Sequence, residues 1–319
     1  MPANRQPRMM DNPYYDWSPI STRATLRWPD ESRVALAVIV NLEYMELEPP
    51  PGIAVPPAAF STSRRSPGPY PGMADIHETS PHEYGNRVGV FRVMQVLDKY
   101  AIKGTAALDA AVAERYPYII EQGQQRGWEF IGHCLVYNRM ITEKMPEPEE
   151  REYIRQSLEA VTKATGKPAQ GWIGVDYGES SRTVRLLAEQ GVRYVCDWPN
   201  DEQPYHMKVP AGHMVSLPTL LDLDDSYAIH GRKISFQRWC QMVIDAFDKL
   251  YEDGAQNGRL LVLNLHPWII GQPYRIGALD DALKHIMRHK GVWAATGSEI
   301  VDWYVQQAPS ATAGVATSS

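Results

Sequence analysis

Short apolar runs alternate along this chain with longer segments in which apolar residues recur every three or four positions. The first run, residues 34–43 (VALAVIVNLE), is almost continuously apolar and rich in β-branched residues, which predicts a strand buried on both faces. Further strands are predicted at 104–109, 128–133, 171–175, 193–197, 213–218, 259–267 and 291–296. Helices are predicted between most of these strands, for example over 86–100, where Val90, Val93 and Leu97 form one stripe.

The order of these elements predicts the fold class. Roughly eight strands, most of them followed by a helix, are typical of an α/β protein whose parallel sheet closes, or nearly closes, into a distorted (β/α) barrel. A doubly wound open sheet is the alternative. The segment after the first strand, NLEYMEL, has no glycine-rich phosphate-binding loop, which excludes the nucleotide-binding form of that alternative. Residues 296–299 (TGSE) predict a capping box for a last helix over 300–307.

Three segments lack this periodicity. Residues 1–30 are predicted to form an irregular N-terminal arm, and residues 307–319 a disordered tail. Residues 46–82 are dense in Pro, Gly and Ser, and a loop of that length usually has a function. We therefore predict one barrel domain over 31–306, in which the 46–82 loop forms a lid over the site or a contact between subunits.

Composition and charge narrow the range of functions. A formal net charge of −6 argues against a nucleic-acid or anionic-membrane partner. No apolar run is long enough to span a bilayer, and the N-terminus lacks the apolar core of a signal peptide. The 3 cysteines are too few and too scattered for a disulfide framework. We expect a cytoplasmic protein that acts on a small molecule.

Ionisable residues stand at or just beyond nearly every predicted strand end. They are Glu43, Asp109, His133, Asp176, Asp197, Asp222 and His266. In (β/α) barrels the chemistry lies at the carboxyl ends of the strands, and ionisable side chains are rarely buried without partners. Their convergence therefore indicates acid–base hydrolysis, with or without a metal. Each has a structural alternative: a strand-end histidine can be a packed core residue, and Asp109 is expected to cap the following helix.

The remaining polar residues carry weaker signals. Asp222, Asp224 and Asp225 form a charged run that we expect to be solvated. The loop histidines at positions 77, 82, 206, 213 and 230 are expected on the surface, although the first two lie where the Pro-rich loop could reach the site. Cys134 adjoins His133 but has no catalytic-cysteine signature, and no serine nucleophile elbow is present.

Five segments together resemble the polysaccharide deacetylase superfamily (carbohydrate esterase family four, nodulation-type deacetylase domain), in its allantoinase-like and intracellular peptidoglycan-deacetylase-like branch. They are VALAVIVNLEYM, EYGNRVGVFRVMQVLDKY, GWEFIGHCLVYN, GWIGVDYGESSRTVRLLAEQGVRYVCDWPNDEQPY and LNLHPWIIGQPYRIGALDDAL, within residues 20–305. The resemblance implies a distorted barrel of parallel strands, hydrolysis of a carbon–nitrogen bond other than a peptide bond, and a homo-oligomer that is often a tetramer.

The resemblance also implies a zinc site of one Asp and two His, with a neighbouring Asp as base and the last-strand His as acid. This chain departs from that pattern twice. Residues 41–43 read Asn-Leu-Glu in place of paired aspartates, and Tyr137, beside Asn138, stands at the spacing of the second metal histidine. Zinc favours His, Cys and carboxylate ligands, so Glu43 and His133 either hold a divalent metal weakly or form a metal-free site. The allantoinase-like group shares these departures and includes metal-independent enzymes that act on small cyclic amides.

We therefore predict hydrolysis of a small cyclic amide, ureide or imide. Glu43 activates water, His266 protonates the leaving nitrogen, and His133 polarises the carbonyl or binds a metal. The residues predicted to bind or orient are Glu83, Arg87, Asn138, Trp172, Asp176, Glu179, Asp197, Trp198 and Asp201. Asp197 or Asp201 is expected to orient an imidazole, and a carboxylate at Asp176 would favour a substrate N–H donor or a cation. The alternatives are a metal-dependent N-deacetylase of an acetylated amino sugar or peptidoglycan fragment, and a non-catalytic ligand-binding barrel.

Overall fold

The computed structural model describes residues 12–47 and 76–308. The strands are β1 (Val34–Leu42), β2 (Thr105–Leu108), β3 (Glu129–Gly132), β4 (Gly171–Trp172), β5 (Tyr194–Val195), β6 (Tyr205–Met207), β7 (Met214–Ser216), β8 (Arg259–Leu265) and β9 (Val292–Ala294). The helices are α1 (Ile76–Tyr84), α2 (Val90–Lys99), α3 (Ala110–Arg115), α4 (Pro117–Gln125), α5 (Glu147–Thr165), α6 (Thr183–Glu189), α7 (Phe236–Gly254), α8 (Ile276–Met287) and α9 (Gly297–Gln307).

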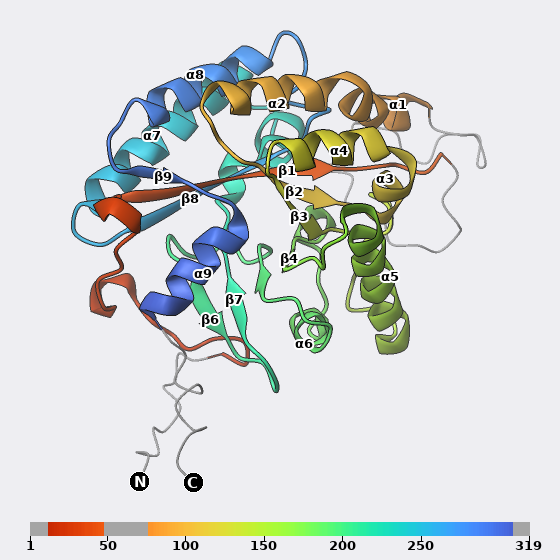
Figure 1. Ribbon diagram of the computed structural model, residues 1–319, viewed down its shortest axis with the longest axis horizontal. Helices are drawn as coiled ribbons and strands as arrows, with labels where there is room; N and C mark the ends of the chain where they lie inside the picture. Colours follow the sequence, from red (N-terminus) through yellow and green to blue (C-terminus); the bar gives the residue numbers. More distant parts are fainter. Residues whose placement is uncertain (1–11, 48–75, 309–319) are drawn as a thin grey trace, which may run out of the picture.

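The strands form one curled sheet in the order β6-β7-β5-β4-β3-β2-β1-β8, and β9 pairs with the first residues of β1. All pairs are parallel except β6–β7. In Figure 1, β1 and β8 run across the view while β6 and β7 run steeply below them, so the sheet curls into a half-barrel. The Leu260 N–H donates to the Glu202 carbonyl at 2.9 Å, which ties β8 to the segment that precedes β6. The predicted fold class is confirmed.

β1 is buried along its whole length because it lies between two layers of core. Val34, Leu36 and Val38 belong to a cluster that includes apolar residues of α2, α7 and α8, and these helices cover one face of the sheet (Figure 1). Ala35 and Ile39 point to the other side, into a cluster that includes residues of β5, β7, β8 and α9. The near-continuous apolar run of β1 is therefore explained by burial of the strand on both faces, as predicted from the sequence.

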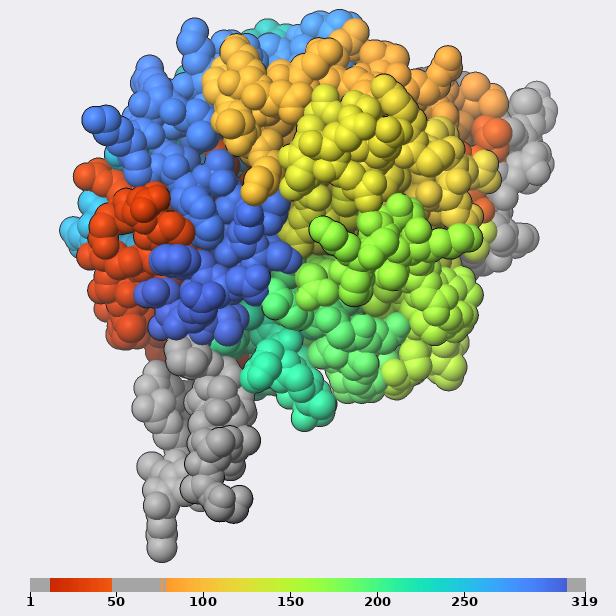
Figure 2. All heavy atoms as spheres, viewed as in Figure 1, coloured from red at the N-terminus to blue at the C-terminus, as the bar shows by residue number. Residues whose placement is uncertain are grey.

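The helix α9 packs against the N-terminal segment on one face of the molecule, where Figure 2 shows these two parts of the chain side by side. The Trp303 indole N–H donates to the Arg27 carbonyl at 2.6 Å. The predicted capping box of α9 is confirmed, because the Thr296 side chain and Glu299 exchange hydrogen bonds with each other's backbone. No helix among the described residues has both the length and the apolar character to cross a membrane.

The structure differs from the expected elements in three places. Strand β6 was not predicted, because its three residues are too short for a visible alternation in a Pro-flanked segment. The helix expected over 86–100 begins with a π-helical turn over Gly85–Gly89. The end of the Pro-rich segment, from Ile76 onward, is helical rather than loop. Residues 48–75, and with them the predicted lid, lie outside the described residues, as do 1–11 of the arm and 309–319 of the tail.

Candidate active site

Glu43 is the first residue after β1, and its carboxylate lies at the carboxyl end of the sheet. The buried strand carries Glu43 into the interior, where 4% of its surface is exposed. Asn86 Nδ2 donates to the Glu43 carbonyl at 2.7 Å, and the Tyr44 N–H donates to Asp109 at 2.6 Å. Asp109 also accepts from the Val112 N–H, so its predicted role as the cap of α3 is confirmed. These bonds fix the position of Glu43 through its own backbone and that of its neighbour.

Three imidazoles and one indole surround the Glu43 carboxylate. His133 Nε2 and His266 Nε2 each lie 3.5 Å from its Oε1 atom. On the other side, His82 Nδ1 lies 3.5 Å from Oε2, and the Trp268 indole N–H donates to Oε2 at 3.1 Å. All four side chains are buried. The structure thus brings together the three residues predicted to be catalytic, and adds His82 and Trp268 to them.

Each strand-end histidine has its second ring nitrogen on a fixed partner. His133 Nδ1 lies 2.6 Å from the Ile173 carbonyl oxygen, which only accepts, so Nδ1 carries the proton and Nε2 faces Glu43. His266 Nδ1 lies 2.7 Å from Asp225 Oδ1, and the His266 backbone N–H donates to the same carboxylate at 2.9 Å. A buried carboxylate in this position fixes the orientation of the imidazole and stabilises its positive charge.

The charges of Glu43 and His266 depend on each other. Burial disfavours the imidazolium of His266, but the surrounding carboxylates, Glu43 first among them, outweigh burial and raise its pKa to about 10. Burial also disfavours the Glu43 carboxylate, but the charge of His266 and the closeness of the other two imidazoles hold the pKa of Glu43 well below its usual range. At neutral pH the site therefore contains a carboxylate that faces an imidazolium.

A small polar cavity opens beside this pair, next to the turn that follows β4. It is lined by Asn41, His133, Gly174, Asp176, Tyr177, Asp224, Ser226, Tyr227, Asn264 and His266. Asn41 Nδ2 donates to Asn264 Oδ1 at 2.7 Å, and Asn264 Nδ2 donates to Asp224 at 2.7 Å. Such a dense set of hydrogen-bonding groups suits a compact, polar substrate.

Three of the residues predicted to bind substrate form a group next to this cavity. Asp197 accepts from the backbone N–H of Gly174, a cavity residue, at 2.7 Å. The Trp198 indole N–H donates to Glu179 at 3.1 Å. Burial raises the pKa of Asp197 to about 6, and burial together with the charge of Asp197 raises the pKa of Glu179 well above its usual range. Asp197, with Glu179 beside it, therefore holds the backbone of the turn that carries Asp176.

Other predicted binding residues lie away from the cavity lining. Arg87 is exposed, and Glu83 accepts from the Tyr116 hydroxyl at 2.6 Å. Asn138 binds the backbone of Glu46, and Trp172 is fully buried in a hydrophobic cluster. Asp201 pairs with Arg23 at 2.5 Å. The expectation that Asp197 or Asp201 orients an imidazole was wrong, because the two strand-end histidines use Ile173 and Asp225 instead.

Five residues at or beside the site were missed or misassigned from the sequence. Asp224 and Asp225 are buried rather than solvated, because the chain after the turn at Leu221–Leu223 bends back to His266. His82 is buried rather than exposed, and His230 is too. For the two aspartates, the sequence signal of a site role was their position beyond a strand end. For His82, the signal was its place at the end of the Pro-rich segment. For Trp268, the only signal was its closeness to His266 in the sequence.

The donor set around Glu43 does not complete a zinc site. Glu43 Oε1 and His133 Nε2, 3.5 Å apart, have the separation of two ligands of one ion. Among the described residues, sets of three His, Cys, Asp or Glu donor atoms within 4.8 Å of one another occur at Asp248, His285 and His289, and at Asp224, Asp225 and His266. Neither set contains Glu43 or His133. Tyr137, at the spacing of a second metal histidine, packs its ring on His82 instead, with centroids 4.4 Å apart.

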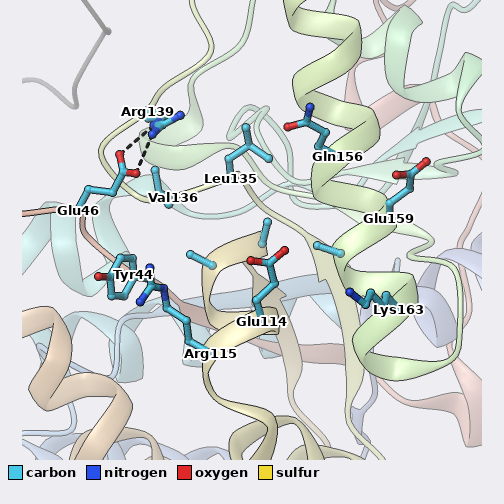
Figure 3. Close-up of a pocket in the computed structure, with 13 residues that line it drawn as sticks. Tyr44, Glu46, Glu114, Arg115, Leu135, Val136, Arg139, Gln156, Glu159 and Lys163 are labelled. Atoms are coloured by element: carbon cyan, nitrogen blue, oxygen red, sulfur yellow. Dashed lines mark hydrogen bonds and ion pairs between the residues drawn. The ribbon is translucent and has the colours of Figure 1, made fainter. Parts of the chain in front are cut away.

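A second hollow, of about 490 Å³, lies on the outer side of Tyr44, between α3 and α5 (Figure 3). Several of its charged side chains have partners: Arg139 binds Glu46 at 2.7 and 2.9 Å, and the Arg115 guanidinium lies over the Tyr44 ring at 4.4 Å. None of its ionisable side chains is buried. The geometry therefore favours the small cavity, rather than this larger hollow, as the place of chemistry.

The chain is similar to proteins of known family and structure. The family model for polysaccharide deacetylase matches residues 82–195, which include His82, His133 and Asp176. The crystal structure of Puue allantoinase superposes with a TM-score of 0.81 and 27% identity, over 91% of this chain and 96% of that one. A structure from Pseudomonas aeruginosa, named as a probable polysaccharide deacetylase, superposes with a TM-score of 0.78 and 28% identity, over 89% and 94% of the two chains.

A curated relative from Schizosaccharomyces pombe is 25% identical over 307 residues, which are 88% of this chain and 93% of that protein. Its name also refers to polysaccharide deacetylase.

Proposed function

From the premise that the chain belongs to the polysaccharide deacetylase superfamily, we propose that its site hydrolyses a carbon–nitrogen bond in a small cyclic amide, ureide or imide. At the level of the superfamily the chain is a hydrolase that acts on carbon–nitrogen bonds other than peptide bonds. The choice of a small cyclic substrate is our own.

One observation carries the proposal: the Glu43 carboxylate and the His266 imidazolium face each other at 3.5 Å beside a small polar cavity. Hydrolysis of an amide requires a base that takes a proton from water and an acid that gives one to the leaving nitrogen. This pair offers both. The cavity measures only about 10 Å³, so the polar groups that line it, rather than its size, support the proposal.

The proposed reaction uses the residues in this order. Glu43 Oε1 takes a proton from a water molecule whose oxygen attacks the carbonyl carbon, which gives a tetrahedral intermediate, while His133 Nε2 contacts the carbonyl group. The tetrahedral intermediate collapses as His266 Nε2 gives its proton to the leaving nitrogen, and Asp225 keeps the ring in line through Nδ1. Because the charge of Glu43 raises the pKa of His266, protonation of Glu43 in the first step makes His266 a stronger acid for the second step, so the two proton transfers are coupled.

A panel of hydantoin, dihydrouracil, allantoin and succinimide tests the proposal, with ring opening followed by NMR. Wild type should open at least one ring, and Glu43→Gln should lower kcat/KM by about 10²-fold or more, the range for a lost general base. His213→Ala, which changes an exposed histidine, should leave kcat/KM unchanged, and it serves as the matched control for the His266→Ala variant described below. A wild-type protein that opens none of these rings contradicts the proposal.

A second candidate function is N-deacetylation of an acetylated amino sugar or peptidoglycan fragment. The family model over residues 82–195 and the names of two of the similar proteins favour it. It uses the same Glu43 and His266 on an acyclic amide. Release of acetate from N-acetylglucosamine oligomers, without ring opening on the panel above, is the result that would select it.

A further inference from the structure

Asp176 lies on a strained turn at the edge of the cavity. Asp176 and Tyr177 both have left-handed backbones, with φ of 47° and 58°. Non-glycine residues in this region cost of order 1–3 kcal/mol in proteins and persist only where the surroundings over-determine them. The strain is thus a first sign that the side chain is held in place for a purpose.

The turn is fixed from several sides. The Gly174 N–H donates to Asp197 at 2.7 Å, and the Gly178 N–H donates to the Val175 carbonyl at 2.8 Å. The Tyr177 hydroxyl donates to Asp224 at 2.8 Å. A side chain at Gly174 would meet the Gly178 carbonyl oxygen at 2.5 Å, so the turn closes only with glycine there. These contacts fix the backbone that carries the Asp176 carboxyl at the edge of the cavity.

The Asp176 carboxyl has an acceptor that the protein does not use. Its Oδ2 atom is buried and has no hydrogen-bond partner among the described residues. Two neighbouring carboxylates are engaged, Asp225 by His266, and Asp224 by Tyr177 and Asn264. Asp197 Oδ2 and Glu179 Oε1 also have no hydrogen-bond partner among the described residues, but these two residues do not line the cavity. Buried polar atoms are rarely left unpaired, and an exception usually marks a place that a ligand or water completes.

The same cavity contains His266, the proposed acid, and His133. A group that binds Asp176 therefore lies within the space where the carbonyl and leaving nitrogen are proposed to sit. A cationic substrate would be repelled by the His266 imidazolium in that space. A neutral N–H donor satisfies Asp176 without that cost.

We propose that Asp176 recognises the substrate by accepting a hydrogen bond from an N–H adjacent to the scissile carbonyl. This inference rests on the proposed function. It names the substrate class as imides and ureides with a free ring N–H, and it predicts that their N-alkylated analogues are poor substrates. Burial, and then the charge of Glu43, raises the pKa of Asp176 to about 7, which agrees with a carboxyl that gains from a donor.

Matched substrate pairs test the inference: succinimide with N-methylsuccinimide, and hydantoin with 3-methylhydantoin. Wild type should prefer the N–H member by about 10²-fold or more in kcat/KM, since sites built to bond an N–H reject analogues without it. Asp176→Gly removes the carboxyl and suits the left-handed backbone, so the fold should be kept. It should reduce the preference to less than about threefold, and Asp176→Asn should give an intermediate value because its amide oxygen still accepts.

The control is Asp222→Gly, which changes an exposed aspartate and should keep the wild-type preference. Equal losses on both members of a pair in Asp176→Gly would overturn the inference, because a purely structural role lowers both alike. Calorimetry on Glu43→Gln separates this result from the proposed function. The N–H members should bind Glu43→Gln at least tenfold more tightly than the N-methyl members, and addition of Asp176→Gly should abolish that difference. If both members of a substrate pair bind Glu43→Gln equally, or if neither binds, the inference about Asp176 is overturned. This holds whether or not wild type opens any ring of the substrate panel.

Discussion

Two buried glutamates of this protein have opposite surroundings. Glu150 on α5 is fully buried, and its oxygens accept from Ser180 at 2.8 Å, Thr183 at 2.6 Å and Arg182 at 3.1 and 3.2 Å. Glu43 is almost as deeply buried, but unpaired polar atoms lie in its neighbourhood, among them His133 Nε2. Burial of a charge thus does not by itself mark a functional site; unused hydrogen-bonding capacity beside it does.

The two glutamates also differ in what they hold. The Glu150 partners all lie in the segment 180–183, where α6 begins, so its network joins α5 to α6. The Glu43 partners come from three distant parts of the chain, at His82, His133 and His266–Trp268. We therefore expect Glu150 to contribute to stability and Glu43 to activity. Variants of the two sites, measured for stability and for activity, test this difference.

The largest expected effect is on catalysis. His266→Ala should lower kcat by about 10³-fold, within the 10²–10⁴ range of general acid–base catalysis, because the leaving nitrogen loses its proton donor. The measurement is steady-state turnover of whichever ring the wild type opens. A His266→Ala protein with wild-type kcat and an intact circular dichroism spectrum would contradict the role of His266.

Loss of the orienting carboxylate should have a smaller effect. Asp225→Asn should lower kcat/KM by about 10–100-fold, the usual cost of losing a partner that orients a catalytic or metal-binding group. It should also lower the pKa of His266 from about 10, since one of the charges that raise it is removed. The position of the alkaline limb of the pH–rate profile in this variant measures that change, and an unmoved limb would argue against the Asp225 contact.

The pH–rate profile should be bell-shaped. Asp176 accepts an N–H bond more strongly when ionised, so activity on imides should increase as the pH rises through about 7, the pKa that burial and Glu43 give this carboxyl. Activity should fall again above about 10, where the His266 imidazolium loses its proton. Burial also raises the pKa of Asp225, to about 6, so the Asp176→Asn variant decides which carboxyl gives the acid limb. An acid limb near 7 that survives in Asp176→Asn would contradict it.

On the other side of the comparison, Glu150→Gln should reduce the free energy of unfolding by about 1–3 kcal/mol, since Arg182 loses its buried charged partner. Its kcat/KM should stay within about threefold of wild type. Glu152→Gln, an exposed glutamate on the same helix, is the matched control and should change stability by less than about 0.5 kcal/mol. Urea denaturation measures both, and a stable but inactive Glu150→Gln would remove the contrast between the two glutamates.

The smallest effect is expected from removal of metal. Because no third His, Cys, Asp or Glu donor among the described residues joins Glu43 and His133 within 4.8 Å, treatment with a chelator should change kcat/KM by less than about twofold. Dialysis against a chelator, followed by assay in metal-free buffer, tests this. Loss of activity that zinc restores would show that the site recruits a ligand from elsewhere.

The fold and the strand-end residues followed from local patterns in the sequence. Continuous apolar runs identified buried parallel strands, and the barrel rule brings Glu43, His133 and His266 to one end, where the structure has each histidine 3.5 Å from Glu43. Which side chains complete the site did not follow. Asp225 stands in a charged run typical of a solvated turn, and only tertiary packing buries it against His266.

His82 follows a segment without periodicity, so nothing local predicted that its ring would stack between Tyr137 and Trp268, with centroids 4.4 Å from each. The contacts of Asp201 likewise could not be predicted from the local sequence. Its position near a strand end suggested an orienting role, but a salt bridge to Arg23 of the N-terminal segment occupies it.

The most direct test of the central claim is ring opening of succinimide and hydantoin by chelator-treated protein, with wild type, Glu43→Gln and Glu150→Gln measured side by side. We predict turnover by wild type and by Glu150→Gln, and a loss of about 10²-fold or more in Glu43→Gln. Equal turnover by wild type and Glu43→Gln, or no ring opening by any of the three, would contradict the account.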